Sequence, residues 1–306
     1  MGSAAEKEKE ADKLLKKANK ETVPSLLDFR FSADWEQAAP LYERAAVIYK
    51  QIGSKEKALE AYERAAIAQE KIGSLWHAAK HYEMCGDICK SSSEWERLSI
   101  FYKRAADMYR TAGKGTSGAD ALARGAKALE DNDSETAIKM DLEALDIYEE
   151  EGKENMGMDV YRATISLMIR TKRYGEAAQA LIRMALACDR LGAKSSQCKA
   201  FLGAMVIHLH NQDAALAWQT FQDALDVEVF SSSDEAFVAD ALFMAYRSGS
   251  EAEIKRVVKE KSVFKQLDNQ VARVAMKLPS SNFSKMAEEI DQLMGGEGED
   301  EEEDVM

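Results

Sequence analysis

Proline is scarce in this chain, with three residues in 306, and most of the 17 glycines fall at the ends of repeated segments. Long runs of β-branched residues and segments of alternating apolar and polar residues are also missing. Because proline breaks helices and alternation marks strands, both absences favour a chain built from helices. With 46% hydrophobic and 31% charged residues, the composition predicts an all-α globular protein.

Long apolar runs are lacking as well. The longest, around residues 200–209, is far too short to span a bilayer, and the N-terminus is charged rather than apolar. The sequence therefore predicts no membrane helix and no signal peptide. It predicts a cytoplasmic location. The four cysteines agree, because each lies among alanines on an expected helix, where reduced cysteine packs as a small hydrophobe. They are Cys85, Cys89, Cys188 and Cys198.

Positive charge is in deficit, with a net charge of −13 and a pI near 5.0, which argues against a nucleic-acid partner. No glycine-rich phosphate loop, HExxH motif or GxSxG motif occurs. His208 and His210 are two residues apart, so on a helix they point to different faces and cannot share a metal ion. We therefore expect no enzyme activity, no small-molecule substrate, no cofactor and no metal site.

What the sequence does contain is a repeat with a period of 20 residues. One tyrosine marks each of four clear copies, which carry Tyr42, Tyr62, Tyr82 and Tyr102. Within a copy, apolar or small residues recur at steps of three and four, which places them on one face of a helix. A fixed period in this range is the signature of a solenoid.

The ends of the copies support one helix per repeat. Gly53, Gly73 and Gly113 stand where a left-handed C-cap is expected, and Ser91-Ser92-Ser93 takes that place in the third copy. Two consecutive helices then form an antiparallel hairpin, and alanines and glycines let the backbones approach closely around each tyrosine. The predicted fold is a right-handed, tetratricopeptide-like solenoid of helical hairpins, which is a twisted sheet of antiparallel helices.

The expected organisation has three parts. Residues 1–210 form the solenoid, with a capping helix at 4–20, eight repeats over 35–192 and a further helix at 195–209. Residues 211–294 lose the period and form a C-terminal helical bundle that seals the open end of the solenoid. Its helices are expected at 213–229, 234–246, 251–261, 269–277 and 284–294. Residues 295–306, with seven acidic side chains, form a disordered tail.

An unusually apolar loop is expected at residues 22–32, where Pro24 ends the first helix. It contains four large apolar residues, namely Leu26, Leu27, Phe29 and Phe31. These side chains either fold back over the end of the solenoid or form an exposed patch that meets a membrane or a partner. The sequence leaves both possibilities open.

Basic residues gather in two places despite the acidic background. One cluster is Arg104, Arg110, Lys114, Arg124 and Lys127, and the other is Arg162, Arg170, Lys172, Arg173 and Arg183. Such clusters are either surface ion pairs of little individual value or a positive strip along the solenoid. A positive strip would suit an acidic, elongated partner such as a helical bundle.

Taken together, these features resemble the soluble NSF attachment protein (SNAP) family over essentially the whole chain, and most closely its gamma branch of plant type. The phrases that carry the resemblance are Ser32-Ala33-Asp34-Trp35, Leu41-Tyr42-Glu43-Arg44-Ala45-Ala46, Ala78-Ala79-Lys80-His81, the run from Ala121 to Asp131, Ser196-Gln197-Cys198-Lys199-Ala200 and Lys277-Leu278-Pro279. The helical C-terminal cap and the acidic tail that ends in apolar residues are similar to the family as well.

The resemblance implies an adaptor without catalysis of its own. Members of the family bind assembled SNARE complexes, which are syntaxin-type four-helix bundles, and recruit and stimulate the AAA+ ATPase NSF. The ATPase then disassembles the bundle, so that the membrane-fusion machinery of vesicle trafficking, including transport between endoplasmic reticulum and Golgi, is reused. A cytoplasmic protein peripherally and weakly associated with membranes is implied.

The resemblance also assigns roles to residues. Membrane contact falls to Leu26, Leu27, Phe29 and Phe31. SNARE contact falls to basic residues, for which the candidates are Arg124, Arg162, Arg170, Lys172 and Arg173. ATPase contact falls to Glu301, Glu302, Glu303, Asp304 and Val305.

Two departures from the family pattern affect these assignments. Val305 stands where the family usually has leucine, which bears on the strength of ATPase stimulation. Asp120 and Asp159 stand near the positions of SNARE-binding lysines in the alpha branch, so Arg124 and Arg162 are substitutes inferred from proximity. The alternative function is a tetratricopeptide-like scaffold for peptide tails of other partners, which would require matched asparagines and lysines along a concave groove.

Overall fold

The computed structural model describes residues 3–24 and 32–295, and every regular element in these ranges is a helix. The chain divides into two compact units, Met1–Lys153 and Glu154–Met306. Within the described ranges, no helix combines the length and apolar character needed to cross a membrane. The prediction of an all-α array of helical hairpins is confirmed.

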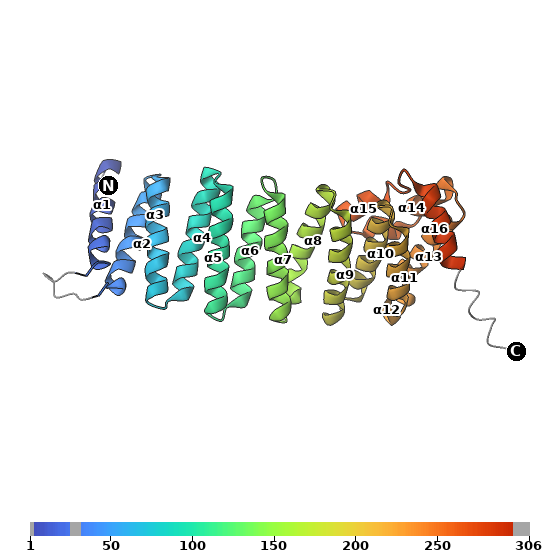
Figure 1. Ribbon diagram of the computed structural model, residues 1–306, viewed down its shortest axis with the longest axis horizontal. Coiled ribbons are helices and arrows are strands. Elements are labelled where there is room, and N and C mark those ends of the chain that lie inside the picture. Colours follow the sequence, from blue (N-terminus) through green and yellow to red (C-terminus); the bar gives the residue numbers. More distant parts are fainter. Residues whose placement is uncertain (1–2, 25–31, 296–306) are drawn as a thin grey trace. The chain divides into compact units, whose positions relative to one another are not determined.

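The described residues of the first unit form seven helices, which stand side by side in chain order (Figure 1). They are α1 (Ala4–Glu21), α2 (Trp35–Gln51), α3 (Lys55–Lys71), α4 (Leu75–Ser92), α5 (Trp95–Thr111), α6 (Gly115–Leu129) and α7 (Ser134–Glu150). The predicted left-handed turns are present, with φ of 78° at Gly53 and Gly73, 68° at Gly113 and 60° at Ser93. One helix per repeat therefore follows from the sequence, with the breaks where glycine permits positive φ.

Ion pairs show that the helices of this unit form two layers. Arg104 on α5 lies 3.3 Å from Glu63 on α3, and Arg124 on α6 pairs with Glu83 on α4. Helices two apart in the chain are thus neighbours within a layer, whereas consecutive helices pack across the layers. This is the arrangement of stacked antiparallel hairpins.

The repeated tyrosines are buried, and each hydroxyl that reaches the edge of the core donates a hydrogen bond to the preceding helix. Tyr42 donates to Asn19 Oδ1 at 2.7 Å, and Tyr102 donates to Asp87 Oδ1 at 2.7 Å. Tyr82 donates in the same way to Glu70, and Tyr148 to Asp120. Burial, followed by these bonds to carboxylates, raises the pKa of Tyr82, Tyr102 and Tyr148. The tyrosines therefore fix the register of successive helices as well as filling the core.

The ring of Tyr102 occupies space that two glycines leave open. A Cβ added at Gly86 on α4 would lie 2.6 Å from Tyr102 Cε2, and one added at Gly125 on α6 would lie 2.9 Å from Tyr102 Cβ. Real side chains do not approach so closely, so this tyrosine fits between its two neighbouring helices only because both lack a side chain there.

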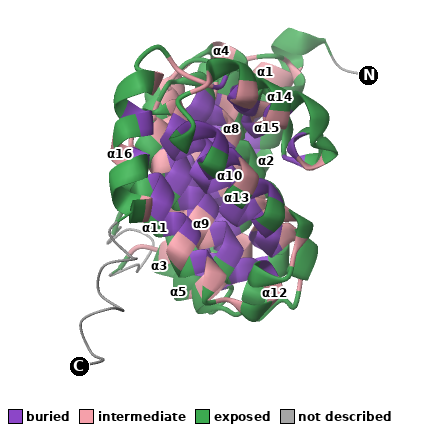
Figure 2. Cartoon of the chain, turned by 90° about the vertical axis from the view of Figure 1, so that its right-hand side faces the viewer, coloured by how far each residue is buried: buried purple, intermediate pink, exposed green. Residues whose placement is uncertain are grey.

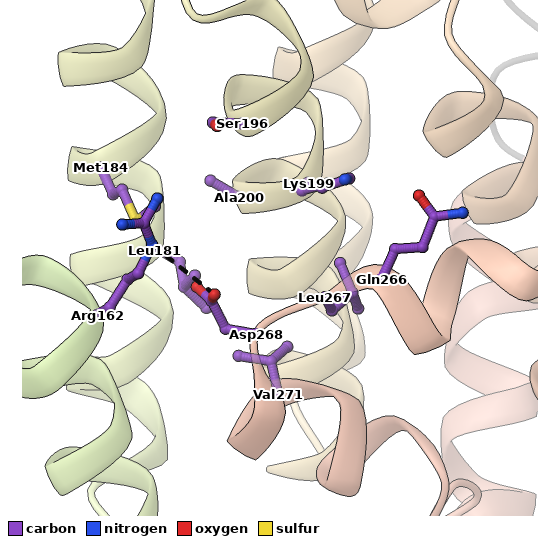
Figure 3. A pocket seen from close by; sticks show the side chains of 10 residues that line it. All are labelled: Arg162, Leu181, Met184, Ser196, Lys199, Ala200, Gln266, Leu267, Asp268 and Val271. Carbon is purple, nitrogen blue, oxygen red and sulfur yellow. Dashed lines mark ion pairs between the residues drawn. The ribbon is translucent and has the colours of Figure 1, made fainter. Parts of the chain in front are cut away.

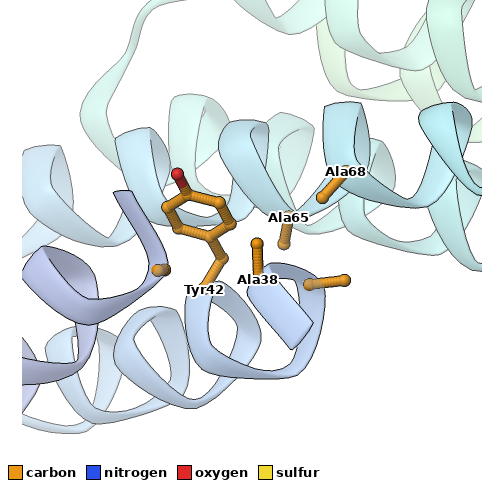
Figure 4. Packing of buried hydrophobic residues seen from close by; sticks show 6 residues of the cluster. Ala38, Tyr42, Ala65 and Ala68 are labelled. Atoms are coloured by element: carbon orange, nitrogen blue, oxygen red, sulfur yellow. The ribbon is translucent and has the colours of Figure 1, made fainter. Parts of the chain in front are cut away.

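The N-terminal end of the first unit is closed by α1. Ala38, Tyr42, Ala65 and Ala68 pack together with Ala18 of this helix (Figure 4). Alanines dominate because short side chains allow the three helices to approach closely. The prediction that the first helix caps the stack agrees with this cluster.

The second unit begins with three helices of similar length and continues with shorter ones. They are α8 (Glu154–Arg170), α9 (Tyr174–Arg190), α10 (Lys194–His210), α11 (Ala214–Leu225), α12 (Glu228–Ser231), α13 (Asp234–Arg247), α14 (Glu251–Glu260), the 3-10 helix η1 (Ser262–Gln266), α15 (Asn269–Ala275) and α16 (Phe283–Gly295). In Figure 2, where this unit faces the viewer, buried residues occupy the centre and exposed ones the periphery.

Helix α10 is the centre of the second unit. It packs against α9, α11, α13 and α15, and an unbroken run of its residues from Cys198 to Leu209, apart from Lys199, is buried. Helix α10 therefore belongs to the same compact unit as the C-terminal helices. The boundary predicted at residue 210 marks the loss of the repeat, and it stays a prediction as a domain division.

One expected helix is divided. The segment 213–229 was expected to be continuous, but α11 ends at Leu225 and Val227 is extended, with φ −88° and ψ 109°, before α12 begins. The break turns Phe230 into the core, where it is fully buried and its ring lies 5.7 Å from that of Phe201 on α10. Burial of a large aromatic side chain thus outweighs the continuity of the helix.

Candidate protein-binding surfaces

The candidate residue of the first unit, Arg124, lies on α6 with its side chain 53% exposed. Its guanidinium pairs with Glu83 on α4, a carboxylate that is only 2% exposed. Lys80 approaches the same carboxylate at 3.2 Å. A buried anion held by two cations is satisfied electrostatically, and it fixes the direction in which Arg124 leaves the helix.

Lys80 extends this cluster to two aromatic rings. Its ammonium lies 5.5 Å from the ring centre of Trp76, which is 44% exposed, and 5.6 Å from that of Tyr109. The approach of Lys80 to Tyr109, and then its hydrogen bond to Glu83, raises the pKa of Lys80. The α4 and α6 surface therefore combines cations with an exposed aromatic side chain, a composition that is common at protein interfaces.

Two other arginines of the first basic cluster are also paired, since Arg104 meets Glu63 at 3.3 Å and Arg110 meets Glu150 at 3.8 Å. The remaining members are Lys114 and Lys127, and neither forms an ion pair with a residue that the structure describes. The sequence therefore identified the cluster but not which of its charges are balanced by neighbours.

In the second unit, Arg162 lies on α8 between two carboxylates. It is 3.0 Å from Asp159 on its own helix and 3.9 Å from Asp268, which precedes α15. It lines a hollow of about 180 Å³ together with Leu181 and Met184 of α9, and in Figure 3 its side chain lies beside theirs. The arginine is thus positioned by one acid next to it in sequence and by another that only the fold brings near.

The other three candidates lie where α8 ends and α9 begins. Arg173 is the N-cap residue of α9 and makes a two-pronged contact with Glu176, with distances of 2.7 and 2.6 Å. Arg170 and Lys172 line a separate, open hollow of about 700 Å³. Arg183, the remaining member of the second cluster, lies with its guanidinium 5.9 Å from the ring centre of Tyr161.

Sequence reasoning missed the cations that join this hollow from the C-terminal region. Lys265 of η1, Arg273 of α15 and Lys277 line it, because α15 packs against α8 and α10. In the sequence these residues are about a hundred positions from Arg170. The sequence showed only that these residues are positively charged and that a helix is expected at 269–277, which does not place them near Arg170.

The remaining predicted contacts lie outside the described residues. They are the membrane contacts Leu26, Leu27, Phe29 and Phe31 and the ATPase contacts Glu301, Glu302, Glu303, Asp304 and Val305.

Buried cysteines and histidines serve packing in the described ranges, where no group of three or more His, Cys, Asp or Glu side chains could hold a metal ion. All four cysteines are buried, and burial raises the pKa of Cys89 to about 11. Burial also lowers the pKa of His208 and of His210.

The described surfaces belong to a helical-repeat protein with charged and aromatic side chains exposed on its helices. Residues 9–278 match the family described as "Soluble NSF attachment protein, SNAP", and the chain belongs to this family. It is 36% identical over 273 residues to the "Gamma-soluble NSF attachment protein" of Arabidopsis thaliana, covering 89% of this chain and 93% of that protein. It is 28% identical over 278 residues to the protein of the same name in Dictyostelium discoideum, covering 91% and 85%. The predicted family is therefore confirmed.

Two solved structures are similar at lower levels. One is the apo form of RapI, with a TM-score of 0.37, 11% identity and coverage of 94% of this chain and 99% of that one. The other is a circular tandem repeat protein with a TM-score of 0.37, 12% identity and coverage of 94% and 88%.

Proposed function

We propose that this protein is an adaptor that binds assembled SNARE complexes and recruits and stimulates the AAA+ ATPase NSF for SNARE disassembly in vesicle trafficking. The observation that carries the proposal is the family match over residues 9–278, together with 36% identity to a gamma-type attachment protein. In this role the chain catalyses no reaction itself, and ATP hydrolysis by the partner supplies the work. The protein acts in the cytoplasm and associates peripherally with membranes.

The SNARE contact is proposed to use Arg124, Arg162, Arg170, Lys172 and Arg173. The side chains of Arg124 and Arg162 are 53% and 45% exposed although each is ion-paired. The ion pair between Arg162 and Asp159 is exposed at both residues, and such pairs are worth only about 0–1 kcal/mol, so an acidic helical bundle can take over this guanidinium at little cost. Arg124 stays paired with the buried Glu83 and offers the exposed part of its side chain to the partner. The partner is a bundle rather than a peptide because the cations lie on several helices instead of within one groove.

Charge reversal tests this contact. Arg162→Glu and Arg170→Glu, combined in one variant, should weaken binding to assembled SNARE complexes by about tenfold or more, because two attractions become repulsions. The matched control is Lys255→Glu with Arg256→Glu on α14, which carries the same change of net charge. Binding is measured on immobilised complexes. If both variants weaken binding equally, the change in net charge alone explains the loss, and Arg162 and Arg170 are not contacts.

The membrane contact is proposed for Leu26, Leu27, Phe29 and Phe31. Full burial of four such side chains is worth roughly 6–12 kcal/mol, and shallow insertion yields part of that, so the anchor is weak by itself. It adds avidity when the SNARE bundle is held at the same membrane. Serine at all four positions should slow disassembly of liposome-bound complexes and spare soluble ones. Equal loss with both substrates argues against a membrane role.

The ATPase contact is proposed for the acidic C-terminal segment, including Glu301, Glu302, Glu303, Asp304 and Val305. Its charge suits a basic pocket, and the attraction should decrease with salt. Removal of residues 297–306 should abolish ATPase recruitment without changing the helical circular dichroism. Recruitment that survives the truncation would move the contact to the C-terminal helices.

The competing function is a tetratricopeptide-like scaffold for the peptide tails of other partners. A pull-down from cell extract separates the two functions. The adaptor should recover SNAREs and the AAA+ ATPase together when ATP hydrolysis is blocked and release them when hydrolysis proceeds. Recovery that is indifferent to ATP would favour the scaffold.

A further inference from the structure

The open hollow of about 700 Å³ in the second unit is lined by an unusual set of charges. Five cations line it, namely Arg170 at the end of α8, Lys172 in the turn before α9, Lys265 of η1, Arg273 of α15 and Lys277 just after α15. None of the described residues that line it is aspartate or glutamate. In a chain with a net charge of −13, this concentration of one sign creates a local positive potential.

Four of the five cations of this hollow have no carboxylate paired with them in the described ranges. The acids closest in sequence are already engaged, since Asp268 lies near Arg162 and Glu176 contacts Arg173. The four cations without a described carboxylate partner are Lys172, Lys265, Arg273 and Lys277. Convergent like charges repel one another, so a bound anion would relieve this repulsion.

The backbone at Lys172 forms the turn between α8 and α9. Its φ is +62°, the left-handed conformation that glycine provides at Gly53, Gly73, Gly113 and other turns between helices of this chain. A residue with a Cβ adopts this conformation less readily than glycine does. Ser93 and Gln212 adopt the same conformation at other turns between helices, so the conformation belongs to the turn, and at this turn it carries an ammonium group that lines the hollow.

The dipole of α9 adds to the positive potential of the hollow, and the pKa of a neighbouring histidine responds to that potential. Tyr174, the first residue of α9, lines the hollow, so the positive end of this helix dipole lies at the rim. The ring of Tyr174 contacts His210 edge-on at 4.9 Å. Burial, and then the charge of Lys277, lowers the pKa of His210, so the imidazole senses the charge in the hollow.

The size of the hollow narrows the class of anion. A volume of about 700 Å³ is within the range of small-molecule sites, about 300–1,000 Å³. Each phosphate group brings up to about two negative charges, whereas an extended peptide places acidic side chains on one face only about every 7 Å. Four unpaired cations around one small hollow are thus matched by two or three phosphates on a compact scaffold. Lysine and arginine both bind phosphate well.

We propose that this hollow binds an organic polyphosphate of the inositol phosphate class, either as a free solute or as the headgroup of a phosphorylated lipid. The site goes beyond the adaptor role, because Lys265, Arg273 and Lys277 are not among the proposed SNARE contacts. A bound polyphosphate would lie beside Arg170 and Lys172, so the two ligands would compete at these two residues.

The test measures binding of the full-length protein to two forms of the ligand. Isothermal titration calorimetry with inositol trisphosphate and inositol hexakisphosphate examines the free solute. Flotation with vesicles containing phosphatidylinositol bisphosphate examines the headgroup, against phosphatidylserine vesicles of equal surface charge. A polyglutamate peptide of equal charge serves as the carboxylate competitor.

Two variants connect binding to the hollow. The triple variant Lys265→Gln, Arg273→Gln and Lys277→Gln should weaken polyphosphate binding by about tenfold or more, since charge-assisted contacts are lost. Lys172→Gly should also weaken binding, while its fold is preserved because glycine favours the left-handed turn. The control is Lys255→Gln, Arg256→Gln and Lys259→Gln on α14, which makes the same substitutions elsewhere in the unit.

Each outcome decides the proposal. Binding of free inositol phosphates that the control retains and both other variants lose supports a soluble ligand, and binding of the bisphosphate vesicles alone supports a lipid headgroup. The pKa of His210 is measured by nuclear magnetic resonance with and without the ligand. A higher pKa in the complex would place the anion in this hollow. No binding, equal binding by all variants, or equal affinity for polyglutamate or phosphatidylserine would overturn it. The adaptor proposal is judged separately by SNARE disassembly.

Discussion

Replacement of Gly125 by alanine should destabilise the first unit, although alanine is the better helix former. The added Cβ would lie 2.6 Å from Met140 Cε and 2.9 Å from both Cβ and Cγ of Tyr102. The methionine tip can move, but the Tyr102 atoms are close to the backbone of α5. The hydroxyl of the same ring is held by Asp87 at 2.7 Å. Helix α5 or α6 must therefore shift, or the ring must leave its position.

The magnitude follows from three contributions. Glycine to alanine inside a helix gains about 1 kcal/mol in helix propensity. Overpacking of a close-packed core costs about 1–3 kcal/mol, and loss of the Tyr102 to Asp87 hydrogen bond costs about 1 kcal/mol. Since the clash involves atoms that cannot rotate away, the costs should prevail, and the net loss should be about 1–3 kcal/mol.

Urea denaturation followed by circular dichroism measures this difference. The control is Gly175→Ala, because a Cβ at Gly175 meets nothing within 4 Å and should not reduce stability. The double variant Gly125→Ala with Tyr102→Leu should lose less than the sum of the two single changes, since the smaller side chain makes room. If Gly125→Ala is as stable as the parent protein, the close fit of tyrosine between glycines does not determine the helix spacing.

Three further changes test other features. Asp133 caps α7 by accepting a hydrogen bond from the backbone N–H of Thr136 at 3.0 Å. Its hydrogen bonds with Thr136 lower the pKa of its carboxyl from 3.8. Asp133→Ala should therefore reduce the free energy of unfolding by about 0.5–2 kcal/mol at neutral pH. Because the folded pKa is the lower one, this stability is present above the unfolded pKa and is lost as the pH falls through the folded value, so acid titration of both proteins should show the difference shrink. Cys89, whose pKa burial raises to about 11, should resist iodoacetamide in the native protein and react fully in urea, as mass spectrometry would show; rapid native labelling would contradict its burial. Pro40 is exposed in the second turn of α2, and Pro40→Ala should restore a helical N–H and raise stability by about 1–3 kcal/mol in thermal unfolding. An unchanged midpoint would mean that the helix already accommodates proline.

Local patterns were sufficient for the individual helices. The spacing of the tyrosines and the glycines between them predicted the helices of the first unit, because a period of 3.6 residues and a left-handed cap are properties of a few consecutive residues. The same reasoning failed at Val227, where the burial of Phe230 against Phe201 breaks the expected helix. That contact joins residues about thirty positions apart and leaves no local pattern.

The candidate sites divide in the same way. Arg170, Lys172 and Arg173 stand together in the sequence, so their cluster was predictable from charge alone. Their partners were not, because Lys265, Arg273 and Lys277 join Arg170 and Lys172 only when α15 packs on α8 and α10. The buried carboxylate of Glu83 beneath Arg124 was likewise hidden, since it lies 41 residues away.

By itself, therefore, the amino-acid sequence determined which segments are helices, where most of them end and which family the chain resembles, because these depend on short-range periodicity, cap residues and local phrases. Tertiary structure alone decided which cations are neutralised, which remain available at a common hollow, and that α10 is the buried centre of the second unit. Those properties depend on distances between residues far apart in the chain, and such distances are set only when the helices pack.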